Sequence, residues 1–134
     1  MAEYMFSYGT LQPDLAPAGM ASLVRQFRHI GGGFIRGILY DLGDYPGAVI
    51  CETALKVWGQ AFELPENPDV LSRLDEYEGF NPADLQHSEF VRTGCVATLE
   101  TGMEIKLWVY VYNRDPGPAP RILDGDFARY RRHC

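Results

Sequence analysis

The length, composition and charge of the chain favour one folded domain and exclude several classes of protein. Its 134 residues can form a hydrophobic core, and shares of 46% apolar and 22% charged residues are typical of a globular rather than a disordered chain. The formal net charge of -6 and the lack of a Lys/Arg run argue against binding to nucleic acid or an anionic membrane. We predict a single domain over residues 1–134 that acts on a small polar molecule.

The cysteine pattern and the lack of a long apolar segment bear on the cellular compartment in which the protein is expected. Cys51, Cys95 and Cys134 are odd in number and widely spaced, which predicts neither a disulfide framework nor a CxxC metal site. No stretch approaches the roughly 18 apolar residues of a membrane span, and the N-terminus does not resemble a secretory signal. We therefore expect a cytoplasmic protein.

In the first third of the chain we predict a strand, a helix and a flexible connection. Residues 3–8 form the strand, and Gly9 allows the turn after it. The helix starts near Gly19 or Met20, because Met20, Leu23, Val24 and Phe27 have amphipathic spacing. The run Gly31-Gly32-Gly33 lacks the spacing of a nucleotide-binding loop and is interpreted as a flexible connection.

The middle of the chain predicts strands and one well-marked helix. Strands are expected at 34–42 and 55–64, with a turn at 43–47 and a short strand at 48–51. The helix covers 68–78, because Asn67 can cap it, Pro68 suits its first position and Gly79 suits its end.

The last third predicts a hairpin and a loop-rich tail. Strands at 90–99 and 103–112 flank a short turn, and the second strand alternates aliphatic with aromatic residues. Burial of both faces fits a closed barrel or a sheet that lines a cavity. The tail from 115 is expected to be loop, with a short basic segment around Tyr130. The fold class is α+β.

Glu78 is the first candidate for chemistry. Helical geometry places it among the apolar side chains of the 68–78 helix, with Asp75 at their margin and Glu76 on the solvated side. A carboxyl group that points inward from the last turn of a helix is expected to have a raised pKa, as a general acid or base requires. Alternatively, Glu78 bends out to solvent or pairs with Arg36 or Arg92.

The segment Tyr8-Gly9-Thr10-Leu11 is the second candidate. By itself it is a tight turn after an edge strand. It could also be a loop whose backbone N–H groups hold a carboxylate or a developing oxyanion, since Gly9 leaves them accessible.

Other candidates have weaker support. His29, His87 and His133 are isolated, so no metal site is predicted. Cys95 fits a small core residue better than a nucleophile, and Ser7 is not in a GxSxG elbow.

Five motifs occur in one order along the chain. They are FSYGTL at 6–11, GILYDLG at 37–43 followed by YPG at 45–47, VWG at 57–59, LDEYEG at 74–79 and VYVY at 109–112. Together they resemble the γ-glutamylcyclotransferase-like family, and they span most of the chain.

The resemblance implies a small mixed β-barrel flanked by helices and an enzyme that needs no cofactor. Such an enzyme releases 5-oxoproline and an amine from a small γ-glutamyl amine, amide or peptide. It implies that Glu78 is catalytic and that Tyr8, Gly9, Thr10 and Leu11 bind the substrate.

One position departs from the family pattern. Many relatives have a Tyr where this chain has Phe90, and this difference affects the expected specificity or activity. Tyr110 or Tyr112 could supply a hydroxyl instead, although a structural role fits both better.

Two alternative functions stay open: a catalytically silent domain that binds a small acidic metabolite, and an amide-processing enzyme of a biosynthetic pathway. The leaving group and the oligomeric state do not follow from the sequence.

Overall fold

The computed structural model describes residues 3–9, 18–43 and 45–132. In chain order, their elements are β1 (Tyr4–Ser7), α1 (Ala18–Val24), β2 (Arg28–Asp41), β3 (Pro46–Ile50), β4 (Lys56–Glu63), α2 (Pro68–Glu78), the 3-10 helix η1 (Leu85–His87), β5 (Phe90–Leu99), β6 (Glu104–Tyr112) and α3 (Phe127–Arg132). No helix in these ranges is long and apolar enough to cross a bilayer.

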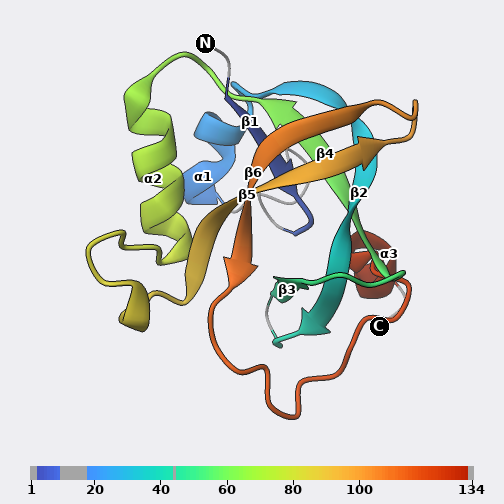
Figure 1. The fold of residues 1–134 in the computed structure, drawn as a ribbon. Helices are drawn as coiled ribbons and strands as arrows, with labels where there is room; N and C mark the ends of the chain where they lie inside the picture. Colours follow the sequence, from blue (N-terminus) through green and yellow to red (C-terminus); the bar gives the residue numbers. More distant parts are fainter. Residues whose placement is uncertain (1–2, 10–17, 44, 133–134) are drawn as a thin grey trace.

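Five strands close into a small barrel (Figure 1). The strand order is β3-β2-β4-β1-β6-β5, and a further pairing of β2 with β5 joins the two ends of the ring. Strand β3 lies outside the ring, paired with β2. The β1–β6 pair is parallel and the other pairs are antiparallel. The predicted α+β fold, a small mixed β-barrel flanked by helices, is confirmed.

The glycine run is part of the barrel wall, so its interpretation as a flexible connection is wrong. Gly31, Gly32 and Gly33 lie within β2 and pair with β4. Gly33 also pairs with Leu99 of β5, and a Cβ at Gly33 would lie 2.3 Å from the Thr98 carbonyl oxygen. The barrel closes at Gly33 because a residue without a side chain lets the two backbones approach.

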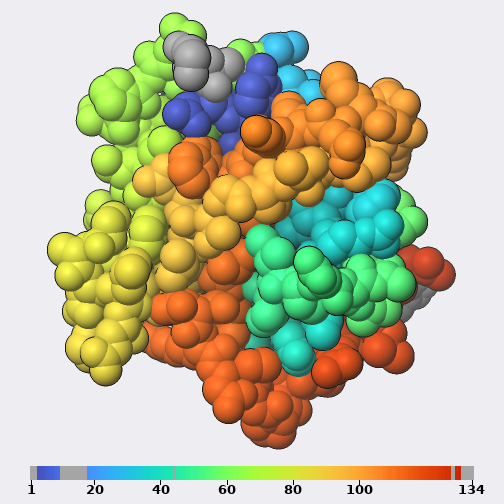
Figure 2. All heavy atoms as spheres, in the orientation of Figure 1, coloured from blue at the N-terminus to red at the C-terminus, as the bar shows by residue number. Residues whose placement is uncertain are grey.

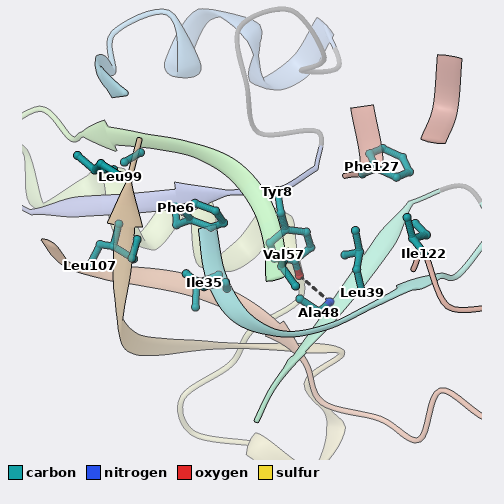
Figure 3. Packing of buried hydrophobic residues seen from close by; sticks show 13 residues of the cluster. Phe6, Tyr8, Ile35, Leu39, Ala48, Val57, Leu99, Leu107, Ile122 and Phe127 are labelled. Carbon is teal, nitrogen blue, oxygen red and sulfur yellow. Dashed lines mark hydrogen bonds between the residues drawn. The ribbon is translucent and has the colours of Figure 1, made fainter. Parts of the chain in front are cut away.

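The core consists of two clusters on opposite faces of the barrel strands. Adjacent residues alternate between them: Phe6 and Val109 belong to the first cluster, Met5 and Tyr110 to the second. Figure 3 shows the first cluster, which also includes Tyr8. The second cluster contains the apolar residues of α1 and α2, so these helices cover one side of the barrel.

Helix α2 has the predicted bounds and caps. The Asn67 side chain accepts a hydrogen bond from the Asp69 N–H at 3.0 Å, and Gly79 ends the helix at φ 72°. Leu74 is fully buried, whereas Tyr77, predicted to be on the apolar stripe, is 39% exposed. The stripe is therefore narrower than predicted.

The tail is more ordered than expected. The Ile122 N–H donates to Leu39, the Trp58 N–H donates to the Gly125 carbonyl, and Phe127 packs in the first cluster. Helix α3 occupies the segment expected to be a basic stretch, and the Tyr130 hydroxyl donates to Asp41 at 2.6 Å. The tail thus packs against β2 and β4.

Candidate active site

Glu78 lies in the last turn of α2, where the residue is half-buried and its carboxyl group is partly desolvated. Burial is the main cause that raises the pKa of Glu78 to about 7, and the negative charge of Glu89 adds to the effect. The shift has the direction that the inward position on the helix predicts. Glu76, two residues earlier, is exposed, as expected.

Tyr8 and Gly9 lie at the end of β1, both buried. The Tyr8 hydroxyl donates to the Tyr110 carbonyl at 2.5 Å and accepts from the Ala48 N–H at 3.2 Å, the contact drawn in Figure 3. Burial and then the charge of Glu78 raise the pKa of Tyr8, so Tyr8 and Glu78 interact electrostatically. Thr10 and Leu11 lie outside the described residues, and their binding role stays a prediction.

Asp75 corrects the prediction that only Glu78 of the three acids points inward. Asp75 is 8% exposed and accepts a hydrogen bond from the Tyr110 hydroxyl at 2.6 Å. Arg92 of β5 faces the same carboxylate, with Nε 3.0 Å from Oδ1 and Nη2 donating to Oδ2 at 3.3 Å. Helical geometry placed Asp75 at the margin, but partners on β5 and β6 hold it inside.

Neither arginine proposed as a partner of Glu78 is placed for that role. Arg92 pairs with Asp75 and stacks over the Trp108 ring at 4.7 Å, and Arg36 donates to the Ala54 carbonyl at 2.9 Å. The alternative in which Arg36 or Arg92 pairs with Glu78 is therefore not supported.

Tyr110 connects the two parts of the site. Its hydroxyl donates to Asp75 on α2, one turn before Glu78, and its carbonyl accepts the hydrogen bond from Tyr8, the residue after β1. The helix that carries Glu78 and the segment that carries Tyr8 are thus fixed relative to each other. Tyr110 has the structural role that was favoured for it.

The sequence matches one protein family over nearly its whole length. The family is described as gamma-glutamyl cyclotransferase, AIG2-like, and the match covers residues 5–129. The chain belongs to this family. No curated protein sequence matches it.

Solved structures show the same cyclotransferase-like fold. The ytfP protein of Escherichia coli is 25% identical, with a TM-score of 0.65 and coverage of 96% of this chain and 98% of that chain. An AIG2-like protein of Mus musculus is 20% identical (TM-score 0.67; 89% and 84% covered). YkqA of Bacillus subtilis is 19% identical (TM-score 0.72), and the match covers 98% of this chain but 41% of YkqA.

Phe90, the departure from the cyclotransferase-like pattern, is buried among aromatic rings. Its ring lies 6.0 Å from that of Tyr45 and 5.5 Å from that of Tyr112. The Tyr45 hydroxyl donates to Oε2 of Glu89, the residue before Phe90. Sequence reasoning missed Glu89 because it lies in no motif; Tyr45 is in the YPG motif, but no local signal indicates its distant partner.

Neither a metal site nor a cysteine nucleophile is supported in the cyclotransferase-like domain. Among residues 3–9, 18–43 and 45–132, no three His, Cys, Asp or Glu residues are grouped to hold a metal ion. Burial raises the pKa of Cys95 to about 11, so its thiol stays protonated at neutral pH.

The raised pKa of Glu78 predicts how the stability of the domain depends on pH. Because the pKa is raised from 4.5 to about 7 on folding, the contribution of Glu78 to stability is fully present below pH 4.5 and is lost as the pH rises through 7. As the pH rises above 4.5, ionisation of Glu78 increasingly favours the unfolded state of the wild-type protein. Glu78→Gln has no group to ionise there, so its free energy of unfolding should exceed that of wild type by an amount that grows to about 3 kcal/mol between pH 5 and pH 8.

Urea unfolding of wild type and Glu78→Gln at pH 5 and at pH 8 measures this difference in the free energy of unfolding. Glu76→Gln is the matched control, because it removes an exposed charge from the same helix. An equal difference between wild type and Glu78→Gln at both pH values would contradict the prediction.

Proposed function

We propose that this protein is a γ-glutamyl cyclotransferase that releases 5-oxoproline and an amine from a small γ-glutamyl amine, amide or peptide. The observation that carries the proposal is Glu78, a half-buried residue whose carboxyl group has a pKa raised to about 7 and interacts with Tyr8 of the FSYGTL motif. At neutral pH such a group is present in both protonation states, as a residue that takes and returns a proton requires.

In the proposed reaction, Glu78 takes a proton from the α-ammonium group of the substrate. The free amine attacks the γ-carbonyl carbon, and the new C–N bond closes a five-membered ring. Protonated Glu78 then gives a proton to the leaving nitrogen, and the original C–N bond breaks. The attacking nitrogen loses its second proton to solvent once the ring has closed, and the released amine takes up a second proton from solvent, so the two protons lost by the ammonium group equal the two gained by the leaving nitrogen.

The turn from Tyr8 to Leu11 would hold the substrate. Its backbone N–H groups would bind the α-carboxylate or the oxyanion that develops on the γ-carbonyl. A Cβ at Gly9 would lie 3.0 Å from Cγ of Pro46, so a side chain at this position would crowd the turn. No cofactor is required, because nucleophile and electrophile belong to one molecule.

Phe90 favours a second candidate function. A Tyr at this position would offer a hydroxyl group, whereas Phe90 is buried and contributes only its ring. A domain that has lost a substrate contact could keep the rest of the site and bind a small acidic metabolite without turning it over.

Assays of the purified protein on γ-glutamyl amines, amides and peptides separate the two functions. We expect release of 5-oxoproline from at least one class, because Glu78 has the pKa that the reaction needs. If no compound is turned over, yet γ-glutamyl ligands raise the melting temperature, the binding domain is supported and the cyclotransferase is rejected.

A further inference from the structure

Glu89 lies directly beside the end of the helix that carries Glu78. The Glu89 N–H donates to the Gly79 carbonyl at 3.2 Å, and a Cβ at Gly79 would lie 3.7 Å from the Cβ of Glu89. On the other side, the Asn113 N–H donates to the Glu89 carbonyl at 2.8 Å. In Figure 2, the segment around residue 85 lies against the chain that follows β6. The backbone of Glu89 is thus fixed between α2 and the end of β6.

Tyr45 fixes the position of the Glu89 side chain. The Tyr45 hydroxyl donates a hydrogen bond to Oε2 of Glu89. This bond is the largest cause that raises the pKa of Tyr45 to about 12, so the phenol keeps its proton at neutral pH. Tyr45 therefore acts on Glu89 as a neutral hydrogen-bond donor.

The other groups that interact with Glu78 do not replace the charge of Glu89. Tyr8, which follows β1, and Tyr110 of β6 both have raised pKa values and are neutral phenols. Asp75, one turn earlier in α2, is paired with Arg92 of β5. Glu89 is the charged group whose repulsion acts on Glu78. Two carboxyl groups in one site resist ionising together, so the desolvated Glu78 keeps its proton to a higher pH.

We propose that Glu89 is a positioning residue whose charge, held in place by Tyr45 beside the end of α2, adds to burial in keeping the proton on Glu78 and thereby shifts the pH range of catalysis. Glu89 acts through Glu78 and need not touch the substrate. The inference rests on the proposed function for its catalytic meaning, but the coupling between the two carboxyl groups is a property of the folded protein and can be measured without turnover.

Glu89→Gln tests the coupling directly. The amide oxygen can still accept the Tyr45 hydrogen bond, so the variant removes the charge with little change of shape. Carboxyl-carbon NMR titration of 13C-labelled protein, with the Glu78 signal assigned through Glu78→Gln, should show the Glu78 midpoint falling by roughly 0.5 to 2 pH units. Glu76→Gln, which removes an equal charge from the exposed side of α2, should leave the midpoint within about 0.2 units of wild type.

The pH dependence of kcat shows whether the same charge affects catalysis. In Glu89→Gln the acidic limb of the profile should move to lower pH by the same amount, while Glu76→Gln keeps the wild-type profile. A Glu78 midpoint that is unchanged in Glu89→Gln, or that falls equally in Glu76→Gln, overturns the inference. A shifted midpoint in a protein that releases no 5-oxoproline supports the coupling and rejects the proposed function.

Discussion

Glu78→Gln should lower the release of 5-oxoproline by about 10² to 10⁴-fold, the range that a positioned acid or base contributes. Gln has nearly the same shape as Glu but cannot take the ammonium proton or return it to the leaving nitrogen. Because the segment Tyr8-Gly9-Thr10-Leu11 is the part proposed to bind the substrate, the loss should fall on kcat rather than on KM. Steady-state kinetics on the best γ-glutamyl compound measure both constants.

Two further variants make this result interpretable. Glu76→Gln should keep wild-type kcat, since Glu76 is exposed on the opposite side of α2. Glu78→Asp keeps a carboxyl group but withdraws it by one methylene, so it should retain part of the activity that Glu78→Gln loses. Turnover by Glu78→Gln at the wild-type rate would refute the mechanism, whichever motifs the chain carries.

Gly33→Ala should have the largest effect on stability, a loss of about 3 kcal/mol or more in the free energy of unfolding. The added Cβ would lie 2.3 Å from the Thr98 carbonyl oxygen and 2.9 Å from the Leu99 Cα, which are backbone atoms that cannot move aside without opening the β2–β5 pairing. Urea unfolding followed by circular dichroism gives the free energy.

Gly32→Ala is the matched control from the same run. Its backbone has no positive φ, and a Cβ there would meet only the ends of two flexible side chains, Oε1 of Glu100 at 3.2 Å and Nε2 of Gln60 at 3.3 Å. It should change the stability by less than about 1 kcal/mol. Equal losses in the two variants would show that the run tolerates no side chain at all, and that closure at Gly33 is not the cause.

The parts of the fold that were predicted correctly carry their signals locally. Helix α2 is marked at both ends, by Asn67 and Gly79, and these residues make the capping contacts that their types predict. The β5–β6 hairpin follows from two alternating segments around a short turn. In these elements the signals are the caps at the helix ends and the turn between two adjacent strands, so the pattern can be recognised without the rest of the fold.

The errors concern residues whose partners are distant in sequence. Gly33 is constrained by Leu99, Asp75 by Arg92 and Tyr110, and Glu89 by Tyr45. Glycine by itself indicates flexibility, and an acid at the edge of an apolar stripe indicates solvent. Only the closed barrel brings the partner that reverses each interpretation. For the same reason Glu78 was identified by its helix, whereas the charge that acts on it was missed.

The closure of the barrel between β2 and β5 also bears on how the protein reaches its native state. The ring is complete only when residue 33 meets residue 99 and when Met5 pairs with Trp108. Folds dominated by such long-range pairings cross a slow transition state, on the millisecond to second scale. During synthesis, β1 lacks its partner β6 and β2 lacks its partner β5 until the chain beyond residue 89 has been made. Shortening the chain before β6 is therefore expected to give a polypeptide that cannot fold, instead of a smaller barrel.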